Sequence, residues 1–378
     1  MNNSLAPTYK TLFGEYWVLW YAVSNSYSIV DCSFKTLLDY YLQSDTLDAF
    51  KAKVIIDDPV SNPDAIAETI CNYLDDCNKS SSPLKDNPLV IDTSNRRILK
   101  QYVIKGKTIK IYFDSELVLK TIHPSLAHLE IEPIASAQTT FDIYLKNGKL
   151  HLFKDEHLIS CVPKRDYHLM QGKFIMHLLC TIHTKEEDDW VGTFHGSTIT
   201  DGNASILFVG ESGKGKSTLC ALLTANGFSL LADDVSPMLS KNKNIYHNPC
   251  ALSLKEGAFD VLQPLINNFE GLPIVKFNKT KGLIKYLPCP SPKKNYYPCH
   301  AIILVNYKNK AETILESVSI KSLLETLIPD SWLSPNPLHA KHFLDWLETL
   351  EIYKLTYSNT KSVTLEISEL FKHHNKNL

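Results

Sequence analysis

A glycine-rich segment in the middle of the chain carries the residue types that bind phosphate groups. Residues 210–217 read Gly-Glu-Ser-Gly-Lys-Gly-Lys-Ser, and the apolar stretch of residues 205–209 precedes them directly. Glycines let successive backbone N–H groups turn toward phosphate oxygens at the start of a helix. Lys216 adds a positive charge for the β and γ phosphates, and the hydroxyl of Ser217 is a ligand for Mg²⁺. The pattern therefore predicts a phosphate loop (Walker A) that binds ATP together with Mg²⁺.

The segments on either side of the loop support this interpretation. Residues 205–209 are typical of a buried strand, and residues 218–224 are typical of a helix. Strand, loop and helix in this order are what a nucleotide-binding α/β sheet requires, and they disfavour a chance glycine-rich turn. We expect nucleotide contacts from Gly210, Glu211, Ser212, Gly213, Lys214, Gly215, Lys216, Ser217 and Thr218.

Two carboxylates follow the next apolar stretch. Residues 227–232 lead into Asp233 and Asp234, seventeen and eighteen residues after Lys216. A second parallel strand beside the first would bring both acids to the sheet edge that holds the phosphates. One acid can then hold Mg²⁺ while the other accepts the proton of an attacking hydroxyl, as in phosphoryl transfer. An aspartate pair that opens an ordinary turn is the alternative.

The N-terminal residues alternate between strand and helix patterns. Residues 15–29 are rich in aromatic and β-branched side chains and predict two short strands around a turn at residues 24–26. Apolar residues spaced as on a helix begin at Phe34, Thr46 can cap a second helix, and Pro63 can open a third. These elements predict a compact unit at residues 1–78, followed by a polar, serine-rich linker at residues 79–88.

The remaining chain divides into a β-rich segment, residues 89–185, and an α/β domain, residues 186–378. In the first, we expect an alternating strand region at residues 101–113, a hairpin around Asn147-Gly148 and a helix over residues 167–182. The second ends with a strand at residues 301–305, helices at residues 320–327 and 337–350, and a closing strand at residues 353–367. The fold class is α/β, or α+β for the whole chain.

Composition limits the partners that the protein can recognise. The chain has 378 residues, of which 21% are charged, and its formal net charge is −2. With so small a net charge, the protein as a whole does not attract nucleic acid or an anionic membrane electrostatically. Apolar runs are shorter than the roughly 20 residues that span a bilayer, and residues 1–9 do not resemble a signal peptide. Any partner must be recognised by a local binding site and not by the overall charge of the protein.

The cysteine pattern favours the cytoplasm. The nine cysteines are irregularly spaced, which fits reduced thiols better than a disulfide framework. A zinc site built from Cys289, Cys299 and His300 is conceivable, but the spacing favours ordinary buried or loop cysteines.

The motif region resembles the catalytic domain of HPr kinase/phosphorylase and its relatives. The resemblance rests on His195-Gly196, the glycine loop and Ala232-Asp233-Asp234-Val235, and it spans residues 150–365. It implies a P-loop kinase domain related to phosphoenolpyruvate carboxykinase, with hydroxyl phosphorylation as its reaction. Asp233 would be the base, assisted by His195, and Lys216 would complete the catalytic residues. Asp234 would join Ser217 around Mg²⁺. Relatives often form a homo-oligomer, but the sequence itself shows no interface for one.

One family signature differs in this sequence. The chain reads Leu252-Ser-Leu-Lys-Glu-Gly257, so Ser253 occupies the position of the family's acidic residue. This difference argues against phosphorylase activity. Lys255 is similar to the lysine of the HPr-kinase-related branch and is a candidate contact for a phosphate or a substrate carboxylate, with a solvated lysine as the alternative.

Residues 1–78 resemble the small winged-helix, PqqD-like domain that binds leader peptides. The similar features are residues 27–31, the helix patterns and the order of the elements. Together the two resemblances imply a kinase that phosphorylates Ser or Thr of a ribosomally made precursor peptide, held by strand addition. The alternatives are a kinase of free serine or another small hydroxylated metabolite, and a nucleotide-dependent peptide-binding scaffold without catalysis. Carboxykinase chemistry is disfavoured because arginines are few.

Overall fold

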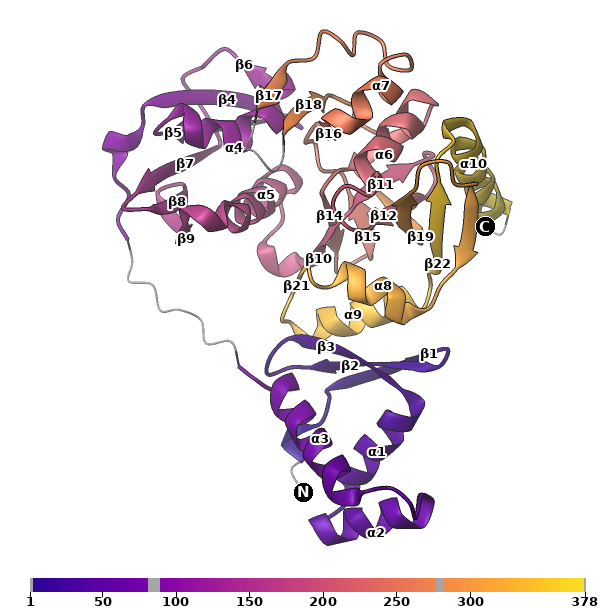
Figure 1. The fold of residues 1–378 in the computed structure, drawn as a ribbon. Coiled ribbons are helices and arrows are strands. Elements are labelled where there is room, and N and C mark those ends of the chain that lie inside the picture. The colour runs from indigo at the N-terminus through magenta and orange to yellow at the C-terminus, as the bar shows by residue number, and fades with distance from the viewer. Residues whose placement is uncertain (1–2, 81–88, 277–281, 377–378) are drawn as a thin grey trace.

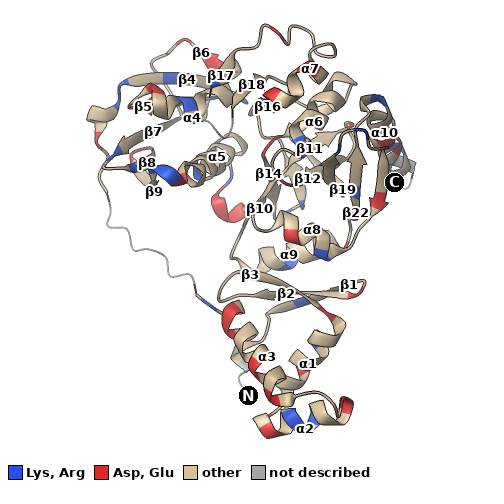
Figure 2. Ribbon diagram, in the orientation of Figure 1, with Lys and Arg blue, Asp and Glu red and all other residues tan. Residues whose placement is uncertain are grey.

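The computed structural model describes residues 3–80, 89–276 and 282–376, which form three parts (Figure 1). The first part contains a three-stranded sheet, the second a six-stranded sheet, and the third a ten-stranded sheet with a small three-stranded sheet beside it. Helices and strands mix along the whole chain, so the predicted α/β class is confirmed. Figure 2 shows residues of both charge signs spread over all three parts, in line with the small net charge.

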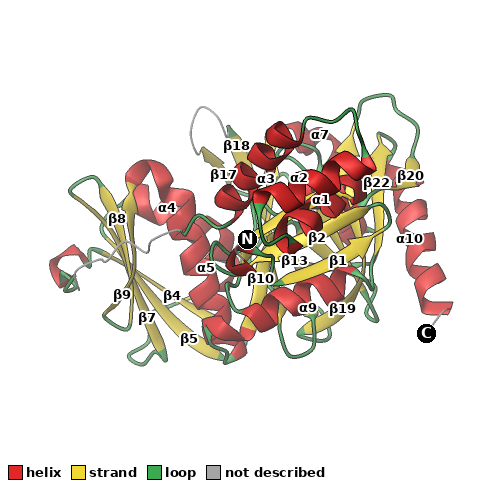
Figure 3. Ribbon diagram, turned by 90° about the horizontal axis from the view of Figure 1, so that it is seen from below, coloured by secondary structure: helices red, strands yellow, loops and turns green. Residues whose placement is uncertain are grey.

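The N-terminal part combines a three-stranded sheet with three helices. Its elements are β1 (Tyr9–Phe13), β2 (Tyr16–Tyr21), β3 (Ser26–Asp31), α1 (Cys32–Gln43), α2 (Leu47–Asp57) and α3 (Pro63–Cys77). The predicted strand pair and the three helices are confirmed, whereas β1 was missed. Thr46 caps α2 by accepting from the Ala49 N–H, and Pro63 is the first residue of α3. Seen from below, α1, α2 and α3 lie over β1 and β2 (Figure 3). Residues 81–88 of the predicted linker lie outside the described residues.

The second part is a six-stranded sheet in the order β6-β4-β5-β7-β8-β9. Its elements are β4 (Ile98–Ile104), β5 (Lys107–Phe113), α4 (Glu116–Leu126), β6 (Glu130–Ile131), β7 (Thr139–Lys146), β8 (Lys149–Lys154), β9 (His157–Pro163) and α5 (Tyr167–His183). The predicted hairpin around Asn147-Gly148 is confirmed, because both residues have the positive φ that a tight two-residue turn requires. The predicted helix is α5, while the alternating region resolves into the hairpin β4–β5. The sequence pattern missed α4.

The third part is built on a ten-stranded sheet. Its strands are β10 (Trp190–His195), β11 (Ser197–Thr200), β12 (Ser205–Val209), β13 (Ser229–Ala232), β14 (Val235–Leu239), β15 (Asn244–Tyr246), β19 (Tyr296–Tyr307), β20 (Ile314–Ser317), β21 (Trp332–Leu333) and β22 (Glu351–Tyr357). The main path runs β13-β11-β12-β19-β15-β14-β10-β21, and β22 joins β19 and β20. The helices are α6 (Lys216–Ala225), α8 (Ile320–Leu327), α9 (Pro337–Leu347) and α10 (Thr360–Lys376).

The predicted neighbours in this sheet were partly wrong. We expected β13 beside β12, but β11 lies between them and pairs antiparallel with both. Two strands that are each antiparallel to the same neighbour run in the same direction. The carboxyl ends of β12 and β13 therefore still reach the same edge, with β11 starting between them.

The predicted closing strand at residues 353–367 was also wrong in its second half. β22 ends at Tyr357, and α10 begins at Thr360. The Asn359 side chain accepts from the N–H groups of Lys361 and Ser362, which starts a helix. Val363, Ile367, Leu370 and Phe371 are buried at helical spacing on one face of α10.

A small sheet packs against α6, next to the glycine-rich loop. It contains β16 (Leu252–Lys255), β17 (Ile274–Lys276) and β18 (Leu283–Leu287), in the order β16-β18-β17, with the short helix α7 (Phe259–Leu262) nearby. Leu252 and Leu254 are buried in the same apolar cluster as Leu219 of α6. This packing fixes β16 close to the start of α6.

The N-terminal part packs on the third part through aromatic and polar contacts. The rings of Tyr27 in β3 and Phe343 in α9 meet edge to face with centroids 5.2 Å apart. The Asn25 side-chain amide donates to the Leu333 carbonyl oxygen at 2.9 Å. Val18 is fully buried in the apolar cluster that includes Phe343. The two parts therefore share one stretch of apolar core.

We predict that Gly196→Ala destabilises the third part. A Cβ at Gly196 would lie 2.6 Å from the Phe208 carbonyl oxygen and 2.9 Å from a Leu207 methyl carbon. Because a backbone oxygen in a paired strand cannot move aside easily, we expect a loss of about 1–3 kcal/mol and a lower thermal unfolding midpoint. Gly172→Ala is the matched control, since its Cβ would meet nothing within 4 Å in α5. An unfolding midpoint equal in both variants would contradict the prediction.

Within the described residues, every helix is too short or too polar to cross a membrane.

Candidate active site

The glycine-rich loop connects β12 to α6 and keeps the backbone geometry that its glycines permit. Gly210, Gly213 and Gly215 have φ of 145°, 90° and 94°. A Cβ at Gly210 would lie 2.9 Å from the Val305 carbonyl oxygen, so its small size is also required. The Tyr307 N–H donates to the Lys214 carbonyl oxygen at 3.1 Å, which ties the loop to β19.

Lys216 is the first residue of α6 and turns back over the loop. Its side chain is 9% exposed, and its Nζ donates to the carbonyl oxygens of Gly210 and Glu211. Burial lowers the pKa of Lys216, while the negative charges of Asp234, Asp233 and Asp330 oppose that shift. The ammonium group thus lies at the loop, next to the positive end of a helix. Ser217 and Thr218 follow it in the first turn of α6.

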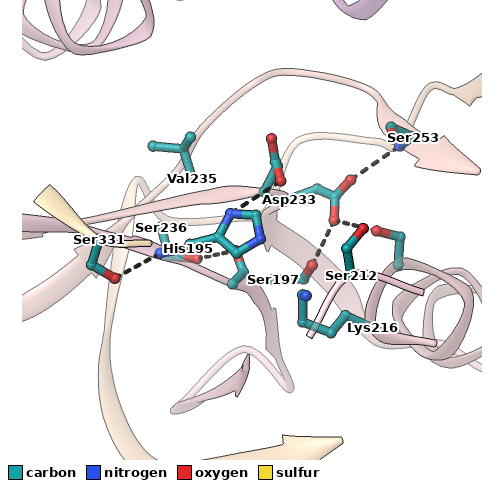
Figure 4. Close-up of polar contacts among 12 residues, drawn as sticks. His195, Ser197, Ser212, Lys216, Asp233, Val235, Ser236, Ser253 and Ser331 are labelled. Carbon is teal, nitrogen blue, oxygen red and sulfur yellow. Dashed lines mark hydrogen bonds and ion pairs between the residues drawn. The ribbon is translucent and has the colours of Figure 1, made fainter. Parts of the chain in front are cut away.

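Asp233 is the centre of a buried hydrogen-bond network (Figure 4). Its Oδ1 accepts from the hydroxyls of Ser197 at 2.5 Å and Ser217 at 2.9 Å, and its Oδ2 accepts from the Ser253 N–H at 3.0 Å. Burial raises the pKa of Asp233, and the charge of Asp234 adds to this effect. The three hydrogen bonds oppose the shift because they favour the charged carboxylate. The acid is therefore fixed against the start of α6.

Asp234 has a very different environment. It has a φ of 64°, and its side chain is 73% exposed. Its Oδ1 lies 3.3 Å from the Nδ1 of His195, the last residue of β10. The His195 N–H donates to the Ser331 hydroxyl at 3.0 Å, which fixes the backbone of the histidine. The exposed carboxylate of Asp234 and the half-buried imidazole of His195 thus form a pair next to the buried acid.

Lys255 reaches the glycine-rich loop from the small sheet. Its Nζ donates to the Ser212 hydroxyl at 2.9 Å. Lys255 and Ser253 are two residues apart on β16, so their side chains lie on the same face of that strand. The structure places the lysine beside the loop, as expected for a contact to phosphate or substrate. The side chain is exposed and makes this hydrogen bond at the surface of the loop.

The sequence-based prediction missed three residues near the acids. Ser197 contributes the shortest of the hydrogen bonds to Asp233. The charge of Asp330 acts on Lys216. Burial raises the pKa of Tyr286, and the charges of Asp234 and Asp233 add to this effect. Ser197 had a usable signal, because it follows His195 by two residues. Asp330 and Tyr286 come from distant segments, and no local pattern marks them.

The conceivable cysteine zinc site is not assembled among the described residues. The Cys299 thiol donates to the Ala301 carbonyl oxygen at 3.3 Å, and the Cys289 thiol donates to the Leu287 carbonyl oxygen at 3.8 Å. All nine cysteines are free thiols in the described part of the chain. Burial raises the pKa of both Cys289 and Cys299 to about 12, so these thiols are protonated at neutral pH.

The arrangement brings opposite charges and polar groups to one edge of the sheet. A lysine at a helix start, a serine hydroxyl and a buried acid meet there. An exposed acid paired with a half-buried histidine lies next to them. The predicted residues His195, Lys216, Ser217, Asp233 and Asp234 are thus close in space, although they come from three separate segments. Such a set can bind an anionic group and accept a proton next to it.

Comparisons with known proteins give distant structural matches but no match in sequence. No protein-family model matches the sequence, and no curated protein matches it. Among solved structures, the Hpr(Ser) kinase/phosphatase from Coxiella burnetii is similar to part of the chain, with 14% sequence identity and a TM-score of 0.22. The match covers 49% of this chain and 97% of that protein's chain.

Proposed function

We propose that the protein is an ATP- and Mg²⁺-dependent phosphotransferase that phosphorylates a hydroxyl group. The observation that carries this proposal is the direct hydrogen bond between Ser217, at the start of α6, and the buried carboxylate of Asp233. This bond brings the carboxylate of Asp233 to the N-terminus of α6, where Lys216 is the first residue. Phosphoryl transfer needs little more than positioning and charge stabilisation from a protein.

The residues present fit a nucleoside triphosphate with Mg²⁺. The loop amides, the start of α6 and Lys216 would hold the phosphates. Hydroxyl and carboxylate oxygens are the ligands that Mg²⁺ prefers, and Ser217 and Asp233 supply both types within 2.9 Å of each other. When bound, Mg²⁺ would neutralise negative charge on the phosphates. Lys255 would add a second positive charge at the loop, because its ammonium group lies beside Ser212.

The contacts favour a particular division of roles between the two acids. Asp233 is buried and holds Ser217, so we assign it to the metal side of the site. Asp234 is exposed and adjacent to His195, so it can accept the proton of an incoming hydroxyl, with the imidazole next to it. The sequence-based prediction made the opposite assignment, with Asp233 as base and Asp234 at the metal. Both versions are testable.

We further propose that the acceptor is a Ser or Thr hydroxyl in a peptide. The N-terminal sheet has the order β1-β2-β3, so β1 and β3 are edge strands among the described residues. An edge strand presents unpaired N–H and C=O groups that can take up an extended peptide. The same sheet is fixed on α9 of the third part, so a captured peptide would be tethered to the domain that carries the site. Such tethering raises the effective concentration of the acceptor.

A direct assay separates the candidate functions. Purified protein is incubated with labelled Mg-ATP and either serine-containing peptides, free serine or no acceptor, and mass spectrometry records the gain of phosphate. Label transfer to peptides supports the proposal. Transfer to free serine alone identifies a metabolite kinase, and tight Mg-ATP binding without any transfer identifies a nucleotide-dependent scaffold.

Deletion of residues 1–78 tests the role of the N-terminal part. We expect kcat/KM for a long peptide to fall by about 100-fold or more, because the acceptor loses its tether. Mg-ATP affinity should stay unchanged. A short acceptor peptide is the matched substrate, and its phosphorylation should be the same with and without residues 1–78.

The short acceptor also controls for damage, because the deletion exposes Phe343 and its neighbours on α9. An equal loss for both peptides would indicate a disturbed third part. Unchanged phosphorylation of the long peptide would refute capture by the N-terminal sheet.

A further inference from the structure

A second group of possible metal ligands lies at the opposite edge of the ten-stranded sheet. Glu351 is the first residue of β22, while His373 and His374 lie near the end of α10. One ligand atom from each of the three residues lies within 4.8 Å of the others. β22 runs parallel to β19, and β19 runs parallel to β12. The start of β22 is therefore at the far edge from the glycine-rich loop, which follows the end of β12.

Two buried imidazole nitrogens, one in this group and one in the neighbouring His300, lack hydrogen-bond partners. His374 is 8% exposed, and its Nε2 lies 3.2 Å from a Glu351 carboxylate oxygen without forming a hydrogen bond. The His300 Nε2 is also buried without a hydrogen-bond partner. A polar atom buried in this way costs free energy unless something satisfies it. The geometry thus brings a carboxylate and an unsatisfied nitrogen together at one point.

The His374 ring is also packed against a neighbouring side chain. The His300 ring stacks on the His374 ring with centroids 5.4 Å apart and shields one of its faces.

Glu351 is itself held by a neighbour. The Tyr353 hydroxyl donates to the Glu351 Oε2 at 2.8 Å. Hydrogen bonds of this kind orient a ligating carboxylate and are a usual part of metal sites. The group therefore has three candidate metal ligands, and Tyr353 positions one of them.

We propose that Glu351, His373 and His374 bind a divalent transition-metal ion, with Zn²⁺ as the best match. Two imidazole nitrogens and one carboxylate suit Zn²⁺, with a water molecule in the fourth position. Mg²⁺ and Ca²⁺ prefer oxygen ligands, so the group differs in chemistry from the serine and carboxylates at the glycine-rich loop.

Metal binding would fasten α10 to the sheet. The ion would link β22 to α10. α10 also packs on the segment after α6, where the ring centroids of Phe371 and Phe228 are 5.3 Å apart. At its other end, β22 finishes at Tyr357, whose hydroxyl donates to the Gly215 carbonyl oxygen at 3.4 Å. A ligand that binds only the folded chain raises its thermal unfolding midpoint.

The test uses the full chain, purified without a polyhistidine tag. Calorimetry measures Zn²⁺ uptake, Co²⁺ absorption reports tetrahedral nitrogen and oxygen ligation, and thermal unfolding is followed with and without Zn²⁺. We expect one ion per chain at this site and a higher unfolding midpoint with Zn²⁺. Loss of a residue that only hydrogen-bonds to a metal ligand typically lowers metal affinity by about 10- to 100-fold. His373→Ala and Glu351→Gln should therefore lower Zn²⁺ affinity by at least about 100-fold, and Tyr353→Phe by about 10-fold.

Two controls decide where an ion binds. His157→Ala removes an exposed histidine from another sheet and should leave Zn²⁺ uptake unchanged. His195→Ala should also keep the uptake, because His195 belongs to the glycine-loop edge. The proposal is overturned if the wild-type chain takes up no Zn²⁺ or Co²⁺. It is equally overturned if uptake survives in both His373→Ala and Glu351→Gln, or if it is lost in His195→Ala alone.

Discussion

Lys216→Ala is expected to abolish phosphoryl transfer and to weaken Mg-ATP binding severely. Lys216 is 9% exposed, and its ammonium group donates to two carbonyl oxygens of the glycine-rich loop. The negative charges of Asp234, Asp233 and Asp330 act on this group. Removing it leaves three acids near bound phosphates with less positive charge to balance them. A single preorganised group that stabilises developing charge is worth about 100- to 1,000-fold in rate, so we expect a loss of at least that size.

Lys214→Ala provides the matched control for this substitution. Lys214 belongs to the same loop, but its side chain is exposed and lies 3.8 Å from Glu211. Its backbone carbonyl oxygen, which accepts from the Tyr307 N–H, remains after the substitution. Calorimetry of Mg-ATP binding and initial rates with a peptide acceptor should show a change of a few fold at most. Equal effects of Lys214→Ala and Lys216→Ala would argue against a special role for Lys216.

Local patterns predicted the elements that carry the site. The order of β12, loop and α6 follows from an apolar run, three glycines and a helical stretch, all within about twenty residues of sequence. The hairpin at Asn147-Gly148 and the caps at Thr46 and Pro63 were predictable for the same reason, because each depends on neighbouring residues. The helix α10 was predictable in principle, since Asn359 caps it and its buried residues have helical spacing.

The arrangement of these elements in space was less predictable. No local pattern shows that β11 separates β12 from β13, because strand order depends on the packing of the entire sheet. The roles of the two acids depend on this order, since Ser197 at the start of β11 reaches Asp233. Lys255 reaches Ser212 only because β16 packs on α6. Contacts between distant segments therefore set the chemistry of side chains that the motif alone identifies.

Asp234→Asn is expected to reduce phosphoryl transfer strongly while Mg-ATP binding remains. The exposed carboxylate next to His195 is the proposed proton acceptor, and general-base catalysis is worth about 100- to 10,000-fold in rate. Asn keeps the size of the side chain but cannot take up the proton. Initial rates at saturating Mg-ATP should fall by a factor in this range, with the affinity from calorimetry changed by a few fold at most.

Asp233→Asn is the matched partner of this variant and is expected to act differently. Its carboxylate accepts hydrogen bonds from Ser217, Ser197 and the Ser253 N–H, so the amide would weaken both Mg-ATP binding and transfer. The opposite pattern, with binding spared in Asp233→Asn and weakened in Asp234→Asn, would support the division of roles predicted from the sequence. Full activity of both variants would falsify a role for either acid in transfer.

The pH dependence of Mg-ATP binding gives an independent test of the same pair. Burial and the charge of Asp234 raise the pKa of Asp233, so its carboxylate becomes protonated at a higher pH than an ordinary aspartate. As pH falls through this raised pKa, the negative charge beside Ser217 is lost and the affinity for Mg-ATP should decrease. Asp234→Asn removes one cause of the raised pKa, so the decrease should move to lower pH. Calorimetric titrations across the acid range measure this shift, and an unchanged profile in Asp234→Asn would show that the two carboxylates are not coupled.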